Sequence, residues 1–355
     1  MREVRWFQKI ALALPALLVY VSALAAPPPT RAPPRFPPSA IWNQDITADS
    51  ADANSATMIA SSVGWGTGAT AFQIDFSFHT IYTSWAGFTQ PAFVKEPGYY
   101  SDCDTGYAVP LPLVGAIEGS SNYSCNLNND CHLTIVHGST LYESYQTFVD
   151  ANGVNALCVV KWHLNLVYPP NGRGDRCTSA DAAGFPITPL LATPNDVWNA
   201  IPANGGNGVL GHALRFTLPN SRIRPGVYVH PATHDGVRSG SGPSNGIPYG
   251  ARLRLRPSFN VGAYNAAAQV ILNTLKTYGM FLSDGGNVPL TLDDGMFTSH
   301  SWFDADINLD THTLFGVALG DFEVMPIGTV YAYDAVTHNC VPNPDDVIFA
   351  DGLEW

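Results

Sequence analysis

The sequence predicts a mainly β fold: one large domain of the β-sandwich or jelly-roll type with a few peripheral helices. Three observations lead to this class. The 355 residues include 32 Gly and 28 Pro, which indicates many turns between short elements. Hydrophobic residues make up 46% of the chain and charged residues 13%, so a core can form and a disordered or coiled-coil chain is excluded. Short apolar or alternating runs, broken by Gly, Pro, Asn and Asp, recur between residues 71 and 256, as expected of strands.

Six of these runs are the clearest predicted strands. They lie at residues 71–76, 132–136, 156–160, 213–217, 226–229 and 252–256. In the last run Arg252, Arg254 and Arg256 alternate with leucines, so one face is apolar and the other carries guanidinium groups. We expect that row to be a solvated or salt-bridged sheet face rather than a site for an anionic ligand.

Helices are expected at three places. The strongest is 265–278, where Asn265 can cap the first turn and Gly279 follows the last one. Shorter helical stretches are expected at 193–198 and 309–317.

The first 25 residues are predicted to be a cleaved secretory signal. Basic residues at positions 2, 5 and 9 precede an apolar run at 10–24, and Ala23 and Ala25 supply the small side chains of a signal-peptidase site. The run is about 15 residues long, shorter than the roughly 20 that a bilayer-spanning helix needs. We therefore expect an exported protein, secreted or held at the cell surface, with no membrane span after cleavage.

Three regions are expected after the signal. Residues 26–40 are rich in proline and predict a polyproline tether. Residues 41–340 contain no linker and no repeat, so we expect one β-rich domain there. Residues 341–355 form an acidic C-terminal tail.

Six cysteines lie after the signal, at positions 103, 125, 131, 158, 177 and 340. An even number in an exported chain indicates disulfides, and no CxxC pair points to zinc. We expect at least two disulfides, one of them Cys125–Cys131 or Cys158–Cys177.

Several stretches of the body resemble a family of exported bacterial proteins. These stretches are IWNQDITADSADANSATMIASS (41–62), AIEG (116–119), CHLTIVHGSTLYESY (131–145), TSADAAGFP (178–186), GHALRFT (211–217), GARLRLRPSF (250–259) and LKTYGMFLSDGGN (275–287). The tail sequence DVIFADGLE (346–354) is similar to the DxIFxDGFE ending of exported gamma-proteobacterial proteins. The resemblance implies an exported β-rich protein of a family found alongside carbohydrate-acting modules, and it implies no particular reaction.

Motifs of several common enzyme classes are missing. The sequence lacks GxSxG, HExxH, GxGxxG and a P-loop, so it offers no nucleophile elbow, zincin helix or nucleotide loop. A mature chain that begins with Ala-Pro also lacks the N-terminal histidine of an oxidative copper site. The formal charge of −12 would repel a phosphate backbone, so nucleic acid is not expected as a partner.

What remains is a set of polar side chains inside apolar segments. His132 and His212 each open a predicted strand, Asp130 lies two residues before His132, and Glu118 precedes a glycine. Burying such groups costs about 1–3 kcal/mol unless a partner replaces water, so they are expected to meet partners or a substrate. We expect the rings of His132 and His212 to reach one sheet edge.

Three chemistries fit this set, although each residue alone also fits an ordinary structural role. Glycoside hydrolysis needs two carboxyl groups, and its candidates are Glu118, Asp130 and Glu143. Elimination from a polysaccharide needs a base and a group that neutralises the uronate. Its candidates are His212, His234, Arg215 and Tyr228. A divalent metal needs histidines and a carboxylate, and its candidates are His132, His212 and His234 with Asp130 or Asp235.

The sequence therefore predicts an exported carbohydrate-active enzyme that cleaves an extracellular polysaccharide or oligosaccharide, by hydrolysis or by elimination. The alternative is a non-catalytic carbohydrate-binding or surface-structural protein. The predicted catalytic residues are His132, His212, Asp130 and Glu118. The predicted substrate-binding residues are Arg215, His234, Glu143 and Asp284. The one cofactor considered for this set is a divalent metal.

Overall fold

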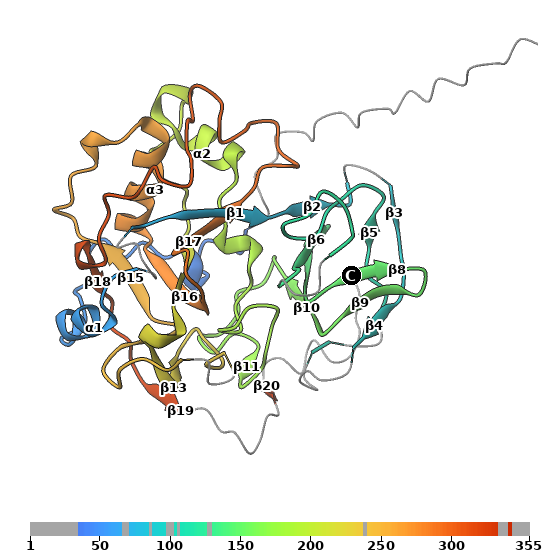
Figure 1. Ribbon diagram of the computed structural model, residues 1–355, viewed down its shortest axis with the longest axis horizontal. Coiled ribbons are helices and arrows are strands. Elements are labelled where there is room, and N and C mark those ends of the chain that lie inside the picture. The colour runs from blue at the N-terminus through green and yellow to red at the C-terminus, as the bar shows by residue number, and fades with distance from the viewer. Residues whose placement is uncertain are drawn as a thin grey trace, which may run out of the picture.

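Two lobes lie side by side in the structure (Figure 1). The computed structural model describes residues 35–65, 71–84, 87–96, 103–104, 107–125, 130–236, 240–332 and 340–342. We call the described residues within 80–163 the small lobe, and those within 35–78 and 164–332 the large lobe. The predicted signal, most of the tether and most of the tail lie outside the described residues. Within the described part of the chain, no helix is both long and apolar enough to cross a membrane.

A mixed sheet is the centre of the large lobe. Its strand order is β1-β17-β12-β16-β15-β18. These strands are β1 (Ile74–Phe78), β12 (Leu214–Leu218), β15 (Arg252–Leu255), β16 (Met280–Gly285), β17 (Leu290–Asp293) and β18 (Phe322–Val324). β1 is parallel to β17 and β12 is parallel to β16, whereas β15 is antiparallel to both neighbours. The register places Thr217 of β12 beside Asp284 of β16.

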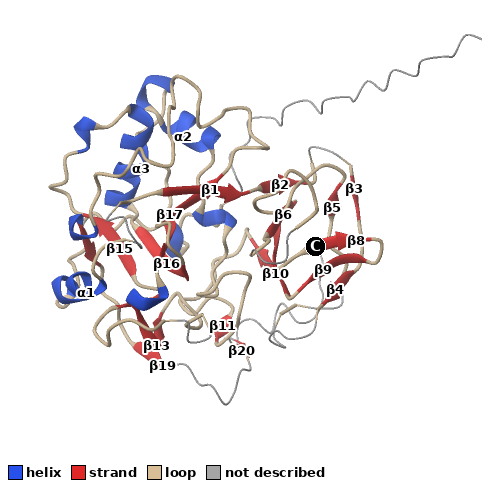
Figure 2. Cartoon of the chain, in the orientation of Figure 1, coloured by secondary structure: helices blue, strands red, loops and turns tan. Residues whose placement is uncertain are grey.

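The α-helices belong to the large lobe (Figure 2). They are α1 (Ser55–Ser62), α2 (Pro194–Ala200) and α3 (Ala266–Thr277). α3 forms where it was predicted, and the Asn265 side chain accepts a hydrogen bond from the backbone N–H of Ala268 at 2.8 Å. Gly279 follows with a φ of 66°, and a Cβ there would lie 2.4 Å from the carbonyl oxygen of Leu253. Glycine is therefore required where this helix ends.

Short strands make up the small lobe. Its largest sheet has the order β10-β7-β6-β2, in which β2 and β6 are parallel and the other pairs are antiparallel. These strands are β2 (Thr80–Tyr82), β6 (Leu133–His137), β7 (Thr140–Tyr145) and β10 (Cys158–His163). Smaller sheets are formed by β3 (Phe88–Thr89), β4 (Phe93–Lys95), β5 (Leu111–Pro112), β8 (Phe148–Asp150) and β9 (Gly153–Ala156). Since β1 ends at Phe78 and β2 begins at Thr80, one residue joins the main sheets of the two lobes.

Two further sheets complete the fold. β13 (Ile223–Val229) lies between β14 (Ile247–Tyr249) and β19 (Val330–Ala332). β11 (Gly174–Asp175) pairs with β20 (Val341–Pro342), which brings the C-terminal part of the body beside the segment that follows the small lobe.

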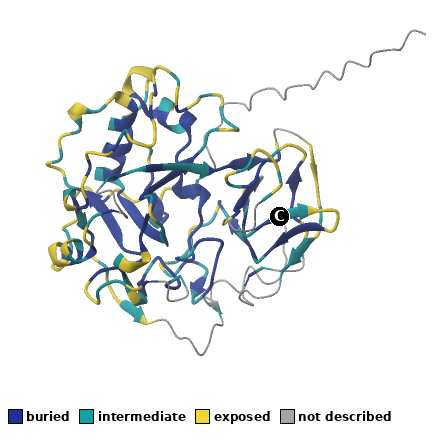
Figure 3. Ribbon diagram, in the orientation of Figure 1, coloured by how far each residue is buried: buried dark blue, intermediate teal, exposed yellow. Residues whose placement is uncertain are grey.

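One buried cluster of apolar residues runs through both lobes. In the large lobe the Trp65 ring lies 4.7 Å from the Phe72 ring and 5.2 Å from the Phe322 ring, centroid to centroid. The same cluster includes Val160 and Trp162 of the small lobe. Figure 3 shows the buried residues in the main strands and the exposed ones in peripheral helices and loops. The buried residues of a second cluster, among them Ile81, Leu133 and Ile135, all lie in the small lobe.

The predicted class, mainly β with few helices, is confirmed, and a strand overlaps each of the six predicted runs. The helix predicted at 309–317 is wrong, because these residues form turns. Its physical reason is that Asp310 Oδ1 accepts a hydrogen bond from the backbone N–H of His312, a local contact that competes with helix formation. The sheets also contain parallel pairs, which an antiparallel jelly roll lacks.

Two arginines of the predicted row, Arg252 and Arg254, are buried on β15, whereas Arg256 just after the strand has 42% of its side chain exposed. Arg254 is 5% exposed and lies 2.7 Å from Glu323 on the adjacent β18. Arg252 donates to the backbone carbonyl oxygens of Gln44 and Tyr278. These partners satisfy the guanidinium groups, so the row supports the fold.

Disulfides join the six cysteines as Cys103–Cys158, Cys125–Cys131 and Cys177–Cys340. The prediction of at least two disulfides is confirmed, as is the pair Cys125–Cys131. The alternative pair Cys158–Cys177 is wrong, because Cys158 on β10 meets Cys103 and the β11–β20 pairing brings Cys340 to Cys177.

Removing the long-range disulfide should cost more stability than removing the local one. Cys103–Cys158 has a sequence separation of 55, whereas Cys125–Cys131 has a separation of 6. Because loop-closure entropy grows with the logarithm of loop length, a Cys103→Ser/Cys158→Ser variant should lose about 2 kcal/mol more than Cys125→Ser/Cys131→Ser. Urea unfolding followed by circular dichroism measures both losses, and equal values would contradict the prediction.

Candidate active site at the junction of the lobes

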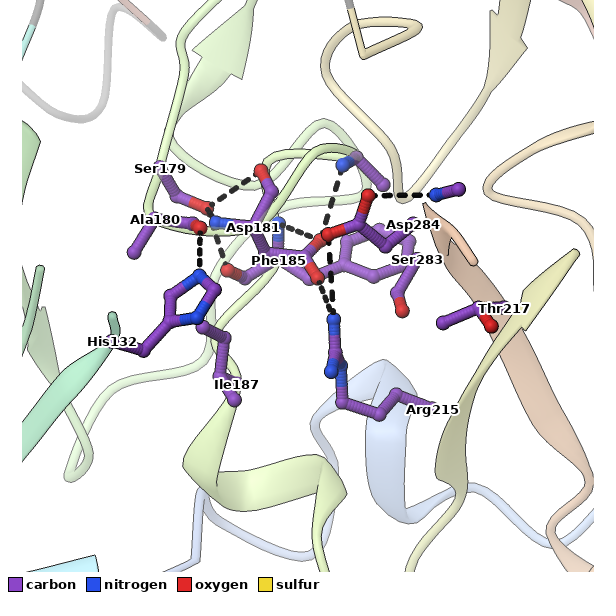
Figure 4. A network of polar contacts seen from close by, with 12 residues as sticks. His132, Ser179, Ala180, Asp181, Phe185, Ile187, Arg215, Thr217, Ser283 and Asp284 are labelled. Atoms are coloured by element: carbon purple, nitrogen blue, oxygen red, sulfur yellow. Dashed lines mark hydrogen bonds and ion pairs between the residues drawn. The ribbon is translucent and has the colours of Figure 1, made fainter. Parts of the chain in front are cut away.

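A buried arginine faces two carboxyl groups at one end of the large-lobe sheet (Figure 4). Arg215 of β12 is 3% exposed, and its Nη2 lies 2.6 Å from Asp181 Oδ1. The same Nη2 lies 3.9 Å from Asp284 Oδ2 of β16. The side chain of Asp181 is wholly buried, while that of Asp284 retains 28% of its exposure. Asp284 is therefore the member of this group that a molecule from solvent can reach.

The loop that carries Asp181 is fixed by its own backbone. Asp181 Oδ2 accepts hydrogen bonds from the backbone N–H groups of Ala183 and Phe185, at 3.1 and 3.3 Å. Ala183 in turn donates its N–H to the carbonyl oxygen of Ser283, next to Asp284, at 2.8 Å. Gly184 has a φ of 82°, and a Cβ there would lie 1.9 Å from Thr233 Oγ1. Gly184 thus allows the loop to approach Thr233 closely, while the bond from Ala183 to Ser283 holds the loop against β16.

An acid and a histidine form a second pair on the small-lobe side. His132, which immediately precedes β6, is 5% exposed, and its Nδ1 lies 2.7 Å from Glu118 Oε2. The other ring nitrogen, Nε2, lies 2.9 Å from the carbonyl oxygen of Ala180, beside Asp181. Glu118 Oε2 also accepts the backbone N–H of His132 at 3.2 Å. Both ring nitrogens have acceptors, as a protonated imidazole requires.

The ring of Phe78, at the end of β1, lies against both pairs. Its centroid is 5.1 Å from that of the His132 ring and 5.1 Å from the Arg215 guanidinium carbon. The two pairs are thus neighbours separated by one aromatic ring. We call Glu118, His132, Asp181, Arg215 and Asp284 the junction cluster, because it surrounds Phe78, the residue at which β1 ends before the small lobe begins.

Glu118 and His132 stabilise each other's charged forms. Burial alone would raise the pKa of Glu118, but His132 outweighs this effect and lowers that pKa to about 2. Burial alone would lower the pKa of His132, but Glu118 raises it to about 9. Near neutral pH the pair is therefore a carboxylate and an imidazolium.

The pKa values of the two acids beside Arg215 are raised, in contrast to that of Glu118. Burial and the charge of Asp181 raise the pKa of Asp284 to about 7, although Arg215 opposes the rise. Burial also raises the pKa of Asp181, again against the effect of Arg215. Two carboxyl groups that face one cation tend to retain a proton between them, and the titration belongs to the pair.

Further polar groups surround the junction cluster. Ser77 Oγ lies 2.8 Å from Asp75 Oδ2 and 3.1 Å from Glu118 Oε1. Burial raises the pKa of Asp75, and Ser77 opposes the rise. The Tyr145 ring lies 5.4 Å from the His132 ring, centroid to centroid. The exposed Asp130 contributes a further negative charge that raises the pKa of both Asp284 and Tyr145.

Five of the predicted site residues meet here. Glu118, His132, Arg215 and Asp284 belong to the junction cluster, and Asp130 lies close enough to act on its charges. Asp130 and His132 both precede β6, and Cys131 between them has a φ of 54°. Strand alternation therefore does not decide where their side chains point.

His212 has other surroundings. It precedes β12, in the large-lobe sheet, whereas His132 precedes β6, in the small-lobe sheet. The expectation that both rings reach one sheet edge is therefore wrong. His212 is 1% exposed, its Nδ1 lies 2.8 Å from the carbonyl oxygen of Ala213, and burial lowers its pKa well below the ordinary value.

His234 and Glu143 also bind groups outside the junction cluster. His234 Nε2 lies 3.0 Å from Thr178 Oγ1, and burial lowers its pKa to about 4. Glu143 is 0% exposed and accepts the backbone N–H groups of Ile187 and Thr188 at 2.8 to 3.0 Å. The fold uses Glu143 to fix the turn at residues 187–188.

Among the described residues, no three His, Cys, Asp or Glu side chains come together in an arrangement that could hold a metal ion. The trio considered for a metal, His132, His212 and His234, is therefore not assembled. The loop acids at 293–310 bind nearby groups: Asp293 accepts the N–H of Gly295, and Asp304 that of Ser301.

Sequence reasoning missed Asp181, Phe78 and Asp75. Asp181 lies within the quoted stretch TSADAAGFP, where it is an acid in a run of small residues. An isolated acid in a run without charged neighbours is a signal for a buried charge that needs a partner. No signal in the sequence indicates that Phe78 would lie between two ion pairs.

Comparisons of this chain with protein-family models, with curated proteins and with solved structures find no match. The argument about function therefore rests on the site itself.

The Glu118–His132 pair should make stability depend on pH in both directions. The pKa of Glu118 falls from 4.5 to about 2, so its contribution is present above pH 4.5 and is lost as the pH falls toward 2. The pKa of His132 rises from 6.5 to about 9, so its contribution is present below pH 6.5 and is lost as the pH rises toward 9. The free energy of unfolding of the wild type should therefore exceed that of Glu118→Gln by about 3 kcal/mol between pH 4.5 and pH 6.5. The difference should be smaller at lower and at higher pH.

Urea unfolding at a series of pH values measures this difference. The control is Asp304→Asn, which removes a histidine partner at 3.2 Å from an acid that is 38% exposed and should change stability little. A difference for Glu118→Gln that stays flat from pH 3 to pH 9 would contradict the assignment of charges.

Proposed function

We propose that this protein is an exported glycoside hydrolase that cleaves an extracellular polysaccharide or oligosaccharide at the junction cluster. The observation that carries the proposal is a pair of carboxyl groups in one cluster whose pKa values are shifted in opposite directions. The pKa of Asp284 is raised to about 7 and that of Glu118 is lowered to about 2. Divergent pKa values of this kind distinguish the acid from the ionised carboxylate in a glycosidase site.

Asp284 has the features of the general acid. Its raised pKa keeps it mostly protonated below pH 7, and 28% of its side chain remains exposed. It can donate its proton to the glycosidic oxygen as the bond to the leaving sugar breaks, which avoids expulsion of an alkoxide. Arg215 and Asp181 lie behind it, away from solvent, and fix its surroundings.

Glu118 has the features of the ionised partner. His132 and Ser77 hold its carboxylate in place, and 15% of its side chain remains exposed. A fixed negative charge stabilises the positive charge that develops on the sugar ring in the transition state. The same carboxylate can attack the anomeric carbon or activate a water, the two routes that glycosidases use.

The charges of the cluster favour hydrolysis over elimination. Elimination from a uronate requires a cation that is free to neutralise the substrate carboxylate. The cations in the described part of the cluster already have partners: Arg215 binds Asp181, and His132 binds Glu118. Together with Asp75 and Asp130, the acids outnumber these cations, so an anionic sugar would be repelled. We therefore infer a substrate without uronate groups.

A partly exposed aromatic stack also fits a sugar ligand. The Trp198 ring lies 4.5 Å from the His300 ring at an interplanar angle of 14°, and Asp306 accepts a hydrogen bond from the Trp198 indole. Flat rings of this kind provide surfaces on which sugars can pack. The other tryptophans that the structure describes are buried, namely Trp42, Trp65, Trp162 and Trp302.

Purified protein should release reducing ends from a neutral polysaccharide. The absorbance of the reaction near 235 nm, which reports elimination, should not rise. The substrates are neutral plant and microbial polysaccharides, with a polyuronate as the comparison. Cleavage of the polyuronate with added absorbance would overturn the hydrolase assignment in favour of a lyase. Binding without release of reducing ends would support a carbohydrate-binding protein instead.

Asp284→Asn and Glu118→Gln should each lower kcat by at least about 100-fold. The first variant loses the general acid, and the second loses the ionised carboxylate. In the wild type, kcat/KM should fall as the pH rises above 7, where Asp284 loses its proton. Asp45→Asn, which alters an exposed acid bonded to Thr47, is the control and should retain wild-type rates. Full activity in Asp284→Asn with the fold intact would show that Asp284 is not the acid.

A further inference from the structure

Arg215 is shared unequally by the two acids beside it. Its Nη2 lies 2.6 Å from Asp181 Oδ1 but 3.9 Å from Asp284 Oδ2 (Figure 4). The first distance is that of a short charge-assisted hydrogen bond, and the second is too long for any hydrogen bond. The guanidinium is therefore bound to Asp181. Asp284 Oδ2 would have to move closer by only about one ångström to form a hydrogen bond with the same nitrogen.

We propose that Asp181 is a positioning residue of the site: by holding Arg215, it prevents an ion pair between Arg215 and Asp284 and leaves the Asp284 carboxyl protonated as a proton donor. This inference rests on the proposed function and adds a residue to it. Asp181 touches no substrate in this role and acts through Arg215 and Asp284.

The hydrogen bonds favour the negative charge on Asp181 over Asp284, and they act against burial, which raises the pKa of both acids. Asp181 accepts from Arg215 and from the backbone N–H groups of Ala183 and Phe185. Asp284 accepts one local bond, from the backbone N–H of Gly285 at 2.7 Å. Donors stabilise the ionised form of a carboxyl group, so the more strongly bonded acid ionises first. The remaining proton then belongs to Asp284.

The loop geometry explains why Asp181 keeps Arg215 in place. The N–H groups of Ala183 and Phe185 fix the carboxylate from one side, and Ala183 is bonded to the carbonyl oxygen of Ser283 on β16. The ring of Phe78 lies 5.1 Å from the guanidinium carbon and limits its movement from the other side. Without the Asp181 charge, the nearest alternative anion for the buried guanidinium is Asp284.

Three titratable groups act on the protonation of Asp284, and a fourth group, Tyr145, lies nearby. Asp181 and Arg215 face it from the large lobe, and Asp130 acts on it from the small lobe. Tyr145 also lies within range, since Asp284 raises the pKa of its hydroxyl. Asp130 raises the pKa of Asp284 as Asp181 does, but it does not bind Arg215 in this structure, so it cannot substitute for Asp181 in holding the guanidinium.

The test compares Asp181→Asn with the double variant Asp181→Asn/Arg215→Met. In the single variant the Asp181 charge is lost and Arg215 is free to pair with Asp284, so the titration midpoint of Asp284 should fall by about two pH units. In the double variant the cation is gone, so the midpoint should return to near neutral pH. The ¹³Cγ signal of Asp284 in protein labelled with ¹³C-aspartate, assigned by its loss in Asp284→Asn, measures the midpoint without any substrate.

Activity gives a second readout of the same comparison. At pH 7 the single variant should lose at least tenfold in kcat, and the double variant should regain at least tenfold over the single one. The alkaline limb of the wild-type pH profile should move to lower pH in Asp181→Asn and back in the double variant. A purely structural role for Asp181 would lower melting temperature in both variants without this reversal.

Two results would overturn the inference. One is an Asp284 midpoint that is the same in Asp181→Asn and in the wild type, with native circular dichroism. The other, which stays decisive if the single variant does not fold, is an Asp284 midpoint in the double variant that falls well below that of the wild type. If the wild type cleaves no glycan but the midpoints move as described, the proposed hydrolase function fails and the role of Asp181 stands.

Discussion

The charge of Arg215 has to be neutralised inside the protein, and much of the junction between the lobes is arranged around that requirement. The side chain is 3% exposed, and a buried cation without a partner would cost several kcal/mol. The loop that carries Asp181 is therefore fixed on two sides: Ala183 donates its N–H to the carbonyl oxygen of Ser283 on β16, and Gly184 permits close approach to Thr233. The same loop offers the carbonyl oxygen of Ala180 to His132, so the two ion pairs depend on one segment of chain.

A buried ion pair does not by itself indicate function, because this protein also contains a buried ion pair that stabilises the fold. Arg254 binds Glu323 and the carbonyl oxygen of Ile46, and these contacts connect β15 to β18 and to an N-terminal segment. The junction cluster differs in one respect. It retains a carboxyl group, Asp284, that is not fully paired and is reachable from solvent. An incompletely paired acid beside a fully paired one is costly for stability, and such costs are typical of functional sites.

Local chemistry predicted the candidate site in part. Arg215, His132 and Glu118 were identified because each is a charged or titratable residue inside an apolar stretch, where it needs a partner, whereas Asp284 belongs to the stretch LKTYGMFLSDGGN that carries the family resemblance. The same signal selected His212, yet a backbone carbonyl satisfies one of its ring nitrogens. A histidine at the start of a strand has the same sequence pattern in both cases. Which sheet contains the strand, and what lies opposite the ring, are set by contacts between residues far apart in the chain.

Elements governed by nearby residues were determined by the sequence itself. The mainly β class, the six strand positions, the helix α3 with its Asn265 cap and Gly279 end, and the local disulfide Cys125–Cys131 depend on periodicity, turn residues and short spacing. Only the tertiary structure decided that Cys158 pairs with Cys103, that strands pair in parallel, and that Asp181 meets Arg215 across 34 positions. The physical reason is that an ion pair or a disulfide requires a distance of a few ångströms between two side chains. No local pattern specifies that distance until the whole chain has packed.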